Sequence, residues 1–313
     1  MDFTLDETQK ELRDLTARLL AEDVGPDALR AAGLFGVCLP EEVGGAGLGA
    51  VEMAVVLREV GARDLPALPL LVGSLAVAAH GSREQQAKVA QAGLTTVAHR
   101  DQGRETTARY AAGWTLTGRK SGVPYGAQAD LVLVAADRGL FLAAPGRSVP
   151  EFTATGAPAA TLVFDGTPAE KLDGGDPGAL ARLFTVGVAA QAGGVLAGAL
   201  ALTTEYVRTR RQFGRALAEF QAVTMQIADV YIASRALDVA MWSAAWGLSD
   251  KDVALAGFHV SEAYRALFTC QHLHGGLGLD VTYPLHRAFA HAKHLTHLLG
   301  GADAQLDLIG ALV

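Results

Sequence analysis

The spacing of apolar residues changes twice along the chain. Up to about residue 93, apolar side chains recur every three or four positions, which is the interval of a helix with one buried face. Pro66 and Pro69 interrupt this pattern, and Ser82, with Glu84 close behind it, is placed to cap a further helix. Ahead of that cap, helices are predicted over 6–22, 26–34, 51–61 and 70–80. We therefore expect an N-terminal helical domain over residues 1–93.

Between residues 94 and 172 the pattern becomes one of short apolar or alternating runs bounded by Gly, Pro and Asp. Such runs are typical of β-strands. They are Arg109–Gly118, Asp130–Ala136, Gly139–Pro145 and Ala160–Asp165. The segment is therefore predicted to be a middle β domain, a small antiparallel barrel or sandwich.

Helical spacing returns after the Gly- and Asp-rich linker Lys171–Gly178. The predicted helices cover 178–210, 219–247, 252–273, 285–298 and 303–312. Long amphipathic helices joined by short connections specify a four-helix bundle, which we assign to residues 173–313. The expected fold class is thus mainly α with a central β domain.

The composition favours closely packed helices, because 50% of the residues are hydrophobic but only 6% are aromatic, and 36 are glycine. Leu183–Thr204 carries no charge and is long enough to cross a bilayer. It consists largely of Ala and Gly, with Gln191 near its middle, so we expect a buried core helix and no membrane span.

Charge and cysteine content exclude several classes of protein. The net charge is -7 and no basic stripe occurs, so nucleic-acid binding is not expected. Two cysteines, Cys38 and Cys270, cannot form a disulfide framework. The first residues lack the basic and apolar regions of a signal peptide, and we expect a cytoplasmic protein.

Two patterns imitate known binding sites. Gly45–Ala50 has the spacing of a dinucleotide-binding loop, but helices rather than a strand are predicted around it, so we expect a plain connecting loop. His291, His294 and His297 recur at three-residue intervals without an interleaved carboxylate. We expect them to form a polar helix face at a subunit contact, and we expect no metal site.

Two further segments could carry chemistry. Arg208–Gly214 lies at a predicted helix end, where cations offset exposed carbonyls and glycine ends the helix; a guanidinium there is also suited to a diphosphate. The second segment, His272–Gly278, contains three glycines, Gly275, Gly276 and Gly278. One glycine would suffice to end the helix, so the additional ones indicate that the backbone approaches a bulky group closely.

With these motifs, the chain resembles the acyl-CoA dehydrogenase family over essentially its whole length. Arg210-Arg-Gln-Phe-Gly with Phe220-Gln221 is similar to the R-x-x-F-G…Q motif of that family. His272-Leu-His-Gly-Gly-Leu-Gly with Tyr283-Pro and Arg287 is similar to its Q-x-x-G-G-x-G…Y-P…R motif. The loop Leu39–Gly47, the hairpin Gly113–Lys120 and the helical–β–helical order also match.

The resemblance implies an FAD enzyme that desaturates an acyl-CoA between Cα and Cβ. A carboxylate removes the α proton while the flavin accepts a hydride from the β carbon. In this family, segments of one subunit contact the diphosphate and adenosine of the FAD that a neighbouring subunit holds. The positions that the resemblance assigns to this contact are Arg210, Gln212, Phe213, His272, Gly275 and Gly276. His272 stands where the family usually has Gln.

The catalytic carboxylate of the family has no counterpart at either of its two usual places. The α proton of a thioester is only weakly acidic, so the reaction needs a positioned base. One place corresponds to Leu299 or Gly300, and the other to Phe184. The nearest acid is Asp303.

The flavin-binding segments of the family are also changed. Its Thr-Glu-Pro…Gly-Ser-Asp strand is replaced by Thr95–Gly103, and the segment after Lys120 by Ser121–Tyr125. In this respect the chain resembles the shorter, non-catalytic subunits of actinobacterial heteromeric acyl-CoA dehydrogenases, including those that act on CoA-linked steroid side chains. This implies a longer homologous partner in a heterotetramer, with this chain inactive on its own.

Two alternatives stay open. The chain could form a self-sufficient homo-oligomer that uses an unusual base such as Asp303, in which case Asp303→Ala abolishes turnover. It could instead be a flavin-free binding or scaffold protein on the same fold, in which case Arg210→Ala leaves FAD content unchanged.

Overall fold

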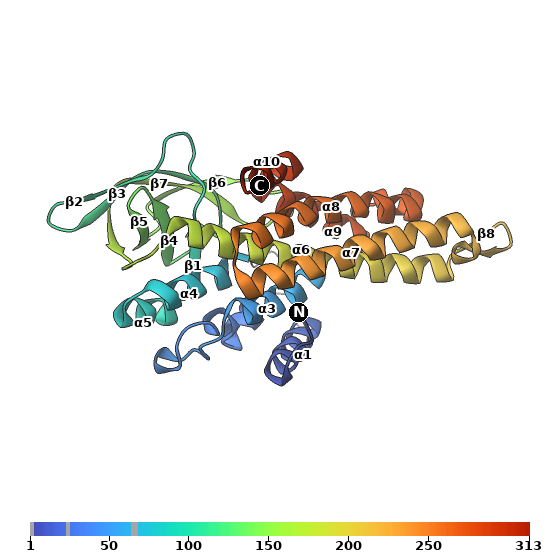
Figure 1. Cartoon of the computed structure of the whole chain (residues 1–313), viewed down its shortest axis with the longest axis horizontal. Helices are drawn as coiled ribbons and strands as arrows, with labels where there is room; N and C mark the ends of the chain where they lie inside the picture. The colour runs from blue at the N-terminus through green and yellow to red at the C-terminus, as the bar shows by residue number, and fades with distance from the viewer. Residues whose placement is uncertain (1–2, 23–25, 64–67) are drawn as a thin grey trace. The chain divides into compact units, whose positions relative to one another are not determined.

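The computed structural model describes residues 3–22, 26–63 and 68–313, and the expected helical–β–helical order is confirmed (Figure 1). The described residues form two compact units that alternate along the chain. We call residues 3–22, 54–63 and 185–313 the bundle unit, and residues 26–53 and 68–184 the sheet unit. The proposed domain boundaries near residues 93 and 172 stay a prediction.

The bundle unit contains long helices that match the sequence-based prediction to within three residues. They are α1 (Glu7–Glu22), α6 (Pro177–Thr209), α7 (Gln221–Gly247), α8 (Asp250–His274), α9 (Pro284–Leu298) and α10 (Gly301–Ala311), with most of α3 (Ala50–Ala62). The first turns of α3 and α6 belong to the sheet unit. Short 3-10 helices precede α7 and α9, namely η3 (Leu217–Glu219) and η4 (Gly275–Leu279).

Glycines let α3 and α6 approach each other closely. A Cβ added at Gly61 would lie 2.0 Å from the carbonyl oxygen of Gln191, and one at Gly194 would lie 1.9 Å from that of Arg58. Both distances are far below van der Waals contact, so any side chain here would push the helices apart. This contact accounts for the small residues of α6. Although that helix is long and apolar enough to cross a membrane, 78% of its most apolar window is buried by the protein, as predicted for a core helix.

An ion pair also joins α3 to α7. Arg58 donates from Nε to Asp238 Oδ1 at 3.0 Å and from Nη2 to Oδ2 at 3.1 Å. Arg235 adds a third bond to the same carboxylate at 3.2 Å, and Asp238 is buried. Hydrogen bonds from two guanidinium groups offset the cost of burying this carboxylate.

The sheet unit is built on one seven-stranded sheet. Its strands are β1 (Thr95–Ala98), β2 (Thr107–Tyr110), β3 (Trp114–Pro124), β4 (Leu131–Ala136), β5 (Gly139–Ala143), β6 (Arg147–Glu151) and β7 (Ala159–Lys171). They lie in the order β1-β4-β5-β7-β3-β2, with β6 also paired to β7. The expectation of a purely antiparallel domain is wrong in one place, since β1 pairs with β4 in parallel. The β2–β3 hairpin between them supplies the crossover that a parallel pair requires.

Helix α4 (Leu68–His80) packs on β1, and α5 (Arg83–Gln91) follows it. Helix α4 begins two residues earlier than predicted, so Pro69 lies in its first turn rather than ahead of it. Proline is tolerated in the first turn because backbone N–H groups there have no partner within the helix. Pro66, the other predicted break, lies outside the described residues.

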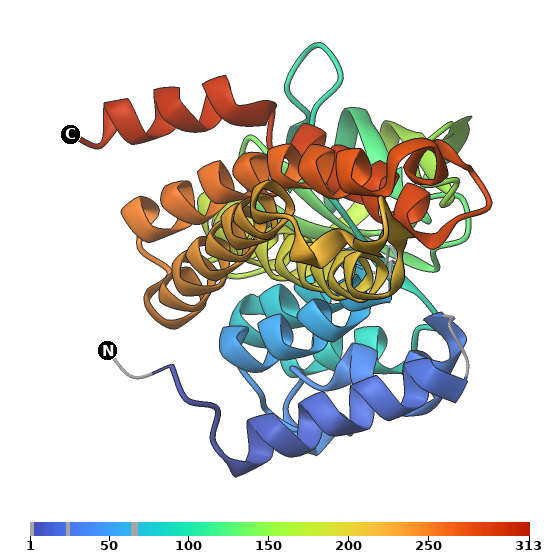
Figure 2. The same cartoon turned by 90° about the vertical axis from the view of Figure 1, so that its right-hand side faces the viewer.

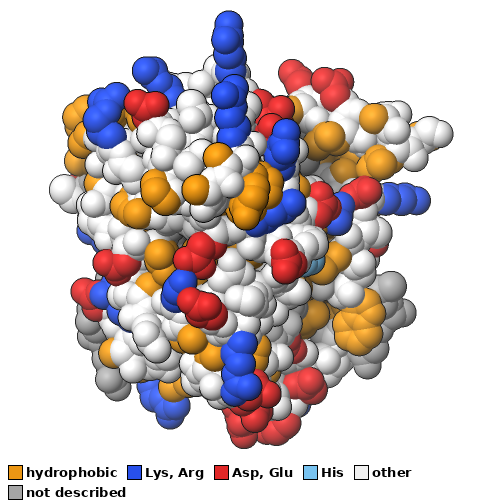
Figure 3. Space-filling model, turned by 90° about the vertical axis from the view of Figure 1, so that its left-hand side faces the viewer, with side chains coloured by type: hydrophobic (Ala, Val, Ile, Leu, Met, Phe, Trp, Pro, Cys, Tyr) orange, Lys and Arg blue, Asp and Glu red, His pale blue; other side chains and the backbone are white. Residues whose placement is uncertain are grey.

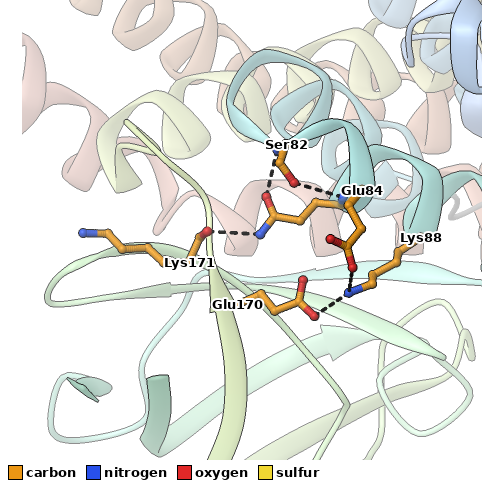
Figure 4. Close-up of polar contacts among 6 residues, drawn as sticks. Ser82, Glu84, Lys88, Glu170 and Lys171 are labelled. Atoms are coloured by element: carbon orange, nitrogen blue, oxygen red, sulfur yellow. Dashed lines mark hydrogen bonds and ion pairs between the residues drawn. The ribbon is translucent and has the colours of Figure 1, made fainter. Parts of the chain in front are cut away.

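The predicted cap of α5 is confirmed, but its partner differs from the one we expected. Ser82 accepts from the backbone N–H of Gln85, whose side chain binds the Ser82 N–H in return, because a capping box forms with the third helical residue. Glu84 instead pairs with Lys88 at 3.1 Å (Figure 4). Lys88 also reaches Glu170 of β7 at 2.7 Å, so α5 is bound to the sheet.

The helix predicted over 26–34 is shorter in the structure. Helix α2 (Pro26–Ala31) gives way to Gly33 at φ 76° and to η1 (Leu34–Gly36). The glycine-rich loop after η2 (Glu41–Val43) leads into α3, as expected for a plain loop. At Gly45 an added Cβ would lie 1.9 Å from the carbonyl oxygen of Leu39, so its own loop requires this glycine.

Candidate functional site

The Arg210–Gly214 segment forms a small hairpin at one end of the bundle unit. Helix α6 ends at Thr209, and β8 (Arg211–Gln212) then pairs with β9 (Arg215–Ala216). The hairpin is at the right-hand end of Figure 1, and Figure 2 looks onto this end. The prediction that Gly214 ends the helix is therefore wrong. That glycine, at φ 82°, instead forms the hairpin turn together with Phe213.

Phe213 is the most unusual residue of this hairpin. Its φ is 52°, in the left-handed region that a bulky side chain rarely adopts, and 90% of its surface is exposed. Its nearest aromatic neighbour is Phe220, with ring centroids 6.3 Å apart. Strained backbone together with an exposed aromatic ring is typical of a position selected for binding rather than for folding.

Four exposed arginines surround this turn, namely Arg208, Arg210, Arg211 and Arg215. The Arg215 guanidinium lies 3.9 Å from the centre of the Phe220 ring, and Arg211 donates to the carbonyl oxygen of Gly214 at 3.1 Å. Within the part of the chain that the structure describes, none of the four pairs with a carboxylate. The hairpin therefore presents uncompensated positive charge, which suits a diphosphate.

The second motif, His272–Gly278, spans the end of α8 at His274. Gly275 has φ 61°, which favours glycine, and it opens η4. Gly276 has no positive φ, and an added Cβ there would meet no atom within 4 Å in the described structure. In contrast, a Cβ at Gly278 would lie 2.6 Å from the carbonyl oxygen of Gln271, so internal packing requires that glycine. The packing of the described residues thus does not require glycine at position 276, which is exposed.

The structure brings the two motifs to the same end of the bundle. The Tyr206 ring, one turn before Arg210, stacks on the His274 ring with centroids 4.2 Å apart. The Tyr206 hydroxyl also donates to the carbonyl oxygen of His274 at 3.4 Å. The last turn of α6 thus contacts the last turn of α8. The predicted site residues Arg210, Gln212, Phe213, His272, Gly275 and Gly276 are all exposed there.

One of the two base positions is occupied by buried aromatic packing in the sheet unit. Phe184 is buried and its ring lies 4.0 Å from that of His99, centroid to centroid. His99 belongs to the Thr95–Gly103 stretch that replaces the flavin strand. Burial, followed by the positive charge of Lys120, lowers the pKa of His99 to about 4, so the ring is neutral at physiological pH. Phe184 and its neighbour His99 do not supply the carboxylate expected at this position.

The other base position lies in the link between α9 and α10. Gly300 has φ 80°, and the Gln305 side chain donates to the carbonyl oxygen of Leu299 at 2.7 Å, which closes the link on itself. Asp303 is exposed in the first turn of α10, where a carboxylate is favourable next to the free N–H groups of the helix. This helix-terminal role accounts for Asp303 without catalysis.

A buried ion pair lies directly beside His99, and no sequence motif indicates it. Lys120 Nζ is 2.7 Å from Asp101 Oδ1, and the lysine side chain is 1% exposed. Lys120 also donates to the carbonyl oxygen of His99 at 3.3 Å, while Thr106 donates to Asp101. Burial acts to raise the pKa of Asp101, but the hydrogen bonds from Lys120 and Thr106 outweigh it and lower the pKa. These groups satisfy one another, which is typical of structural packing.

The Ser121–Tyr125 segment is likewise tied to its own sheet. The backbone N–H of Gly122 donates to the Glu151 carboxylate at 3.1 Å, and the Thr161 hydroxyl donates to the same carboxylate. The Thr95–Gly103 and Ser121–Tyr125 segments are thus held by contacts within the sheet unit.

The expectation of a polar histidine face on α9 is wrong for His291, which is buried, with 1% of its surface exposed. Burial, with a smaller effect of His294, lowers the pKa of His291 to about 3. His297 is exposed and contacts the carbonyl oxygen of Lys293 at 2.7 Å. In the described ranges no three His, Cys, Asp or Glu side chains come close enough together to hold a metal ion.

Two family models match most of the chain. A model of the N-terminal domain of acyl-CoA dehydrogenases matches residues 6–95, and a model of the C-terminal domain of acyl-CoA dehydrogenases matches residues 184–313. Acyl-CoA dehydrogenase FadE28 of Mycobacterium tuberculosis (strain ATCC 25618 / H37Rv) is 38% identical over 334 residues, which cover 99% of this chain and 98% of that protein. Acyl-CoA dehydrogenase FadE27 of the same strain is 33% identical over 366 residues, covering 99% and 98%.

Two solved structures share both fold and sequence with this chain. A variant of the Tcur3481-Tcur3483 steroid ACAD superposes with a TM-score of 0.90 at 35% identity, covering 99% of this chain and 98% of that one. The ChsE4-ChsE5 complex from Mycobacterium tuberculosis contains a chain that superposes with a TM-score of 0.89 at 31% identity, again covering 99% and 98%.

Proposed function

Since the chain belongs to the acyl-CoA dehydrogenase family, whose members are flavin-dependent oxidoreductases, we propose that it is one subunit of a heteromeric acyl-CoA dehydrogenase. In this proposal a longer homologous partner supplies the catalytic carboxylate and most of the flavin site. This chain contributes the Arg210–Phe213 and Gly275–Gly276 segments, which we call the clamp, to FAD on the partner. The complex desaturates an acyl-CoA between Cα and Cβ in the cytoplasm.

The observation that carries the proposal is the contrast between the clamp and the base positions. The clamp is exposed, it contains an uncompensated cluster of arginines, and Gly276 has no internal reason to be glycine. Phe184 and Leu299 lie instead in local packing that closes on itself. The chain thus exposes residues suited to an external ligand but has no carboxylate at either expected base position. This combination supports a site that two chains form together.

The residues present fit the part of FAD that we assign to them. Arg210 and its neighbours offer guanidinium donors for a diphosphate, and an unobstructed backbone at Gly276 allows close approach of a flat group. When bound, the flavin supplies the acceptor for the hydride. The clamp residues bind and orient the cofactor, and they neither hold nor move the substrate proton.

The relatives support a heteromeric assembly and a bulky substrate. One similar structure is described as the ChsE4-ChsE5 complex, and another as a variant of the Tcur3481-Tcur3483 steroid ACAD. We therefore include a CoA thioester of a steroid side chain as the substrate of the complex. FAD as the cofactor and a heterotetramer as the assembly follow from the same analogy.

An exposed apolar stripe on α7 supports association with other subunits. Large apolar side chains recur there at seven-residue intervals over the length of the helix, and each is at least half exposed: Met225, Ile232, Val239 and Trp246. Apolar surface of this extent is typical of a face that another subunit covers.

Expression of the chain alone and together with a longer homologue tests the proposal. We expect the lone chain to bind little FAD and to leave acyl-CoA unchanged, whereas the co-purified pair should contain FAD and desaturate the thioester. Absorbance of the bound flavin and reduction of an artificial electron acceptor measure the two properties. Stoichiometric FAD and turnover in the lone chain would refute the proposal and favour a self-sufficient enzyme.

A further inference from the structure

His274 joins the two halves of the clamp. It is the last residue of α8, it directly precedes Gly275, and only 3% of its surface is exposed. Its ring stacks on Tyr206 of α6 at 4.2 Å with an interplanar angle of 20°, and Tyr283 lies on another side at 5.2 Å. Tyr206 lies one helical turn before Arg210. One imidazole thus lies between the helix that leads to the arginine hairpin and the helix that leads to the glycines.

Hydrogen bonds fix the tautomer of this ring. The Thr203 hydroxyl has one hydrogen, which it donates to the carbonyl oxygen of Ala199 at 2.7 Å. In the 3.2 Å contact between His274 Nε2 and Thr203 Oγ1 the histidine is therefore the donor, and we assign the proton to Nε2. Nδ1 is then a buried acceptor, and it has no partner among the described residues.

The unpartnered Nδ1 shows that packing alone does not favour histidine at this position. A phenyl ring would stack on Tyr206 in the same way and would leave no buried acceptor unsatisfied. What the imidazole adds is its Nε2–H, which sets the rotation of the ring against Thr203. The carbonyl of the same residue accepts from the Tyr206 hydroxyl and leads directly into Gly275 at φ 61°. Ring rotation and the course of the glycine backbone are therefore linked.

We propose that His274 is a positioning residue: through Thr203 and Tyr206 it holds the Gly275–Gly276 backbone at a fixed place relative to the arginine hairpin, so that both can bind one FAD. The proposal rests on the function given above. His274 does not touch the cofactor in this account. It fixes the distance between two segments that do, and it thereby lowers the conformational entropy lost on binding.

Two variants of the co-purified complex test this role, with FAD affinity and thermal stability measured on the same samples. His274→Phe keeps the stack but removes the Nε2–H, and Thr203→Val removes its acceptor. For each we expect FAD to bind roughly five- to tenfold more weakly, the effect of one neutral hydrogen bond that orders a binding segment. The melting temperature of the FAD-free His274→Phe complex should not fall, because this variant also removes the unsatisfied acceptor. Thr203→Val leaves the buried Nε2–H of His274 without an acceptor, so its melting temperature should fall as well.

A purely structural histidine gives the opposite pattern. In that case the melting temperature of His274→Phe falls while FAD affinity in the folded fraction stays unchanged in both variants, and this result would overturn the inference. A parallel loss of both properties in His274→Phe would also overturn it. His297→Phe, at an exposed histidine on α9 outside the clamp, is the matched control and should change neither.

Arg210→Ala, measured beside these variants, separates the two proposals. If Arg210→Ala weakens FAD binding and His274→Phe does not, only the positioning role fails. If Arg210→Ala leaves FAD affinity unchanged, the clamp itself is refuted and the role of His274 falls with it.

Discussion

The clamp of the bundle unit, which we propose contacts FAD, and the Phe184 region of the sheet unit, where we expected a catalytic base, differ in how their side chains are used. Around Phe184 the polar and aromatic groups satisfy one another: Lys120 pairs with Asp101, and His99 packs on Phe184. In the clamp Phe213 is exposed on strained backbone, and Gly276 has no neighbour that requires it.

This difference separates residues retained for folding from residues that need a partner. A group whose contacts all lie within its own unit contributes to stability, so its substitution lowers the free energy of unfolding even when no ligand is present. A group that is exposed, strained or unpaired contributes little to folding, so its substitution mainly lowers the affinity for the ligand. The variants below should therefore separate effects on stability from effects on FAD binding.

Asp101→Ala should give the largest change, and it should be a change in stability. The substitution leaves the buried Lys120 ammonium without its carboxylate, which costs about 3–5 kcal/mol in comparable buried pairs. Chemical denaturation of the chain measures the loss.

The matched control for this variant is Lys88→Ala. Lys88 pairs with Glu84 and Glu170 at the surface of the sheet unit, and its removal should leave the denaturation midpoint unchanged. Figure 3 shows charges of both signs interspersed on one face of the molecule, where single exposed pairs contribute little. Equal losses from both variants would contradict the structural role of the Lys120 pair.

Arg210→Ala should give the next largest change, and it should be confined to FAD binding by the complex. A charge-assisted contact with a diphosphate corresponds to a loss of about 10- to 100-fold in affinity, with the denaturation midpoint of the lone chain unchanged. Fluorescence titration of the apo-complex with FAD measures it. Arg109→Ala, at an exposed arginine of β2, should not change FAD affinity.

Phe213→Gly should change the two properties in opposite directions. Because Phe213 has φ 52° and is 90% exposed, glycine relieves strain without loss of packing and should stabilise the lone chain by about 0.5–1 kcal/mol. The same variant should weaken FAD binding by the complex. Phe152→Gly is the control, since Phe152 is fully exposed but is not among the described residues with positive φ. A destabilised Phe213→Gly chain would show that this ring serves folding.

The order of elements could be predicted from the sequence because it depends on local periodicity. The bundle helices follow from apolar residues at helical spacing, and the cap of α5 from Ser82. Strand pairing could not be predicted in the same way. The parallel pairing of β1 with β4 depends on where the 32-residue crossover between them brings the chain back to the sheet. The spacing of apolar residues does not indicate which strands become neighbours.

The candidate site likewise has a part that local sequence predicts and a part that depends on long-range contacts. The clamp segments are short motifs at predicted helix ends, so their exposure there could be predicted from the sequence, although the hairpin turn at Phe213 could not; their contact with FAD stays a prediction. The contacts around the base positions join residues far apart in the chain, such as His99 with Phe184 and Asp101 with Lys120. Charge partners at such separations cannot be deduced from one sequence, and neither can the Tyr206–His274 stack.

Buried histidines outside the clamp should make stability, but not cofactor affinity, depend on pH. Burial lowers the pKa of His291 to about 3, below the ordinary value of 6.5 that applies in the unfolded chain. The unfolded state therefore binds more protons between these values, so this stability is present above pH 6.5 and is lost as the pH falls toward 3. Between pH 7 and 5.5 the loss should be about 1 kcal/mol for this residue. His291→Gln should flatten the pH dependence measured by urea denaturation, whereas His297→Gln, at an exposed site, should not. An equal pH dependence in both variants would mean that His291 titrates normally in the folded chain.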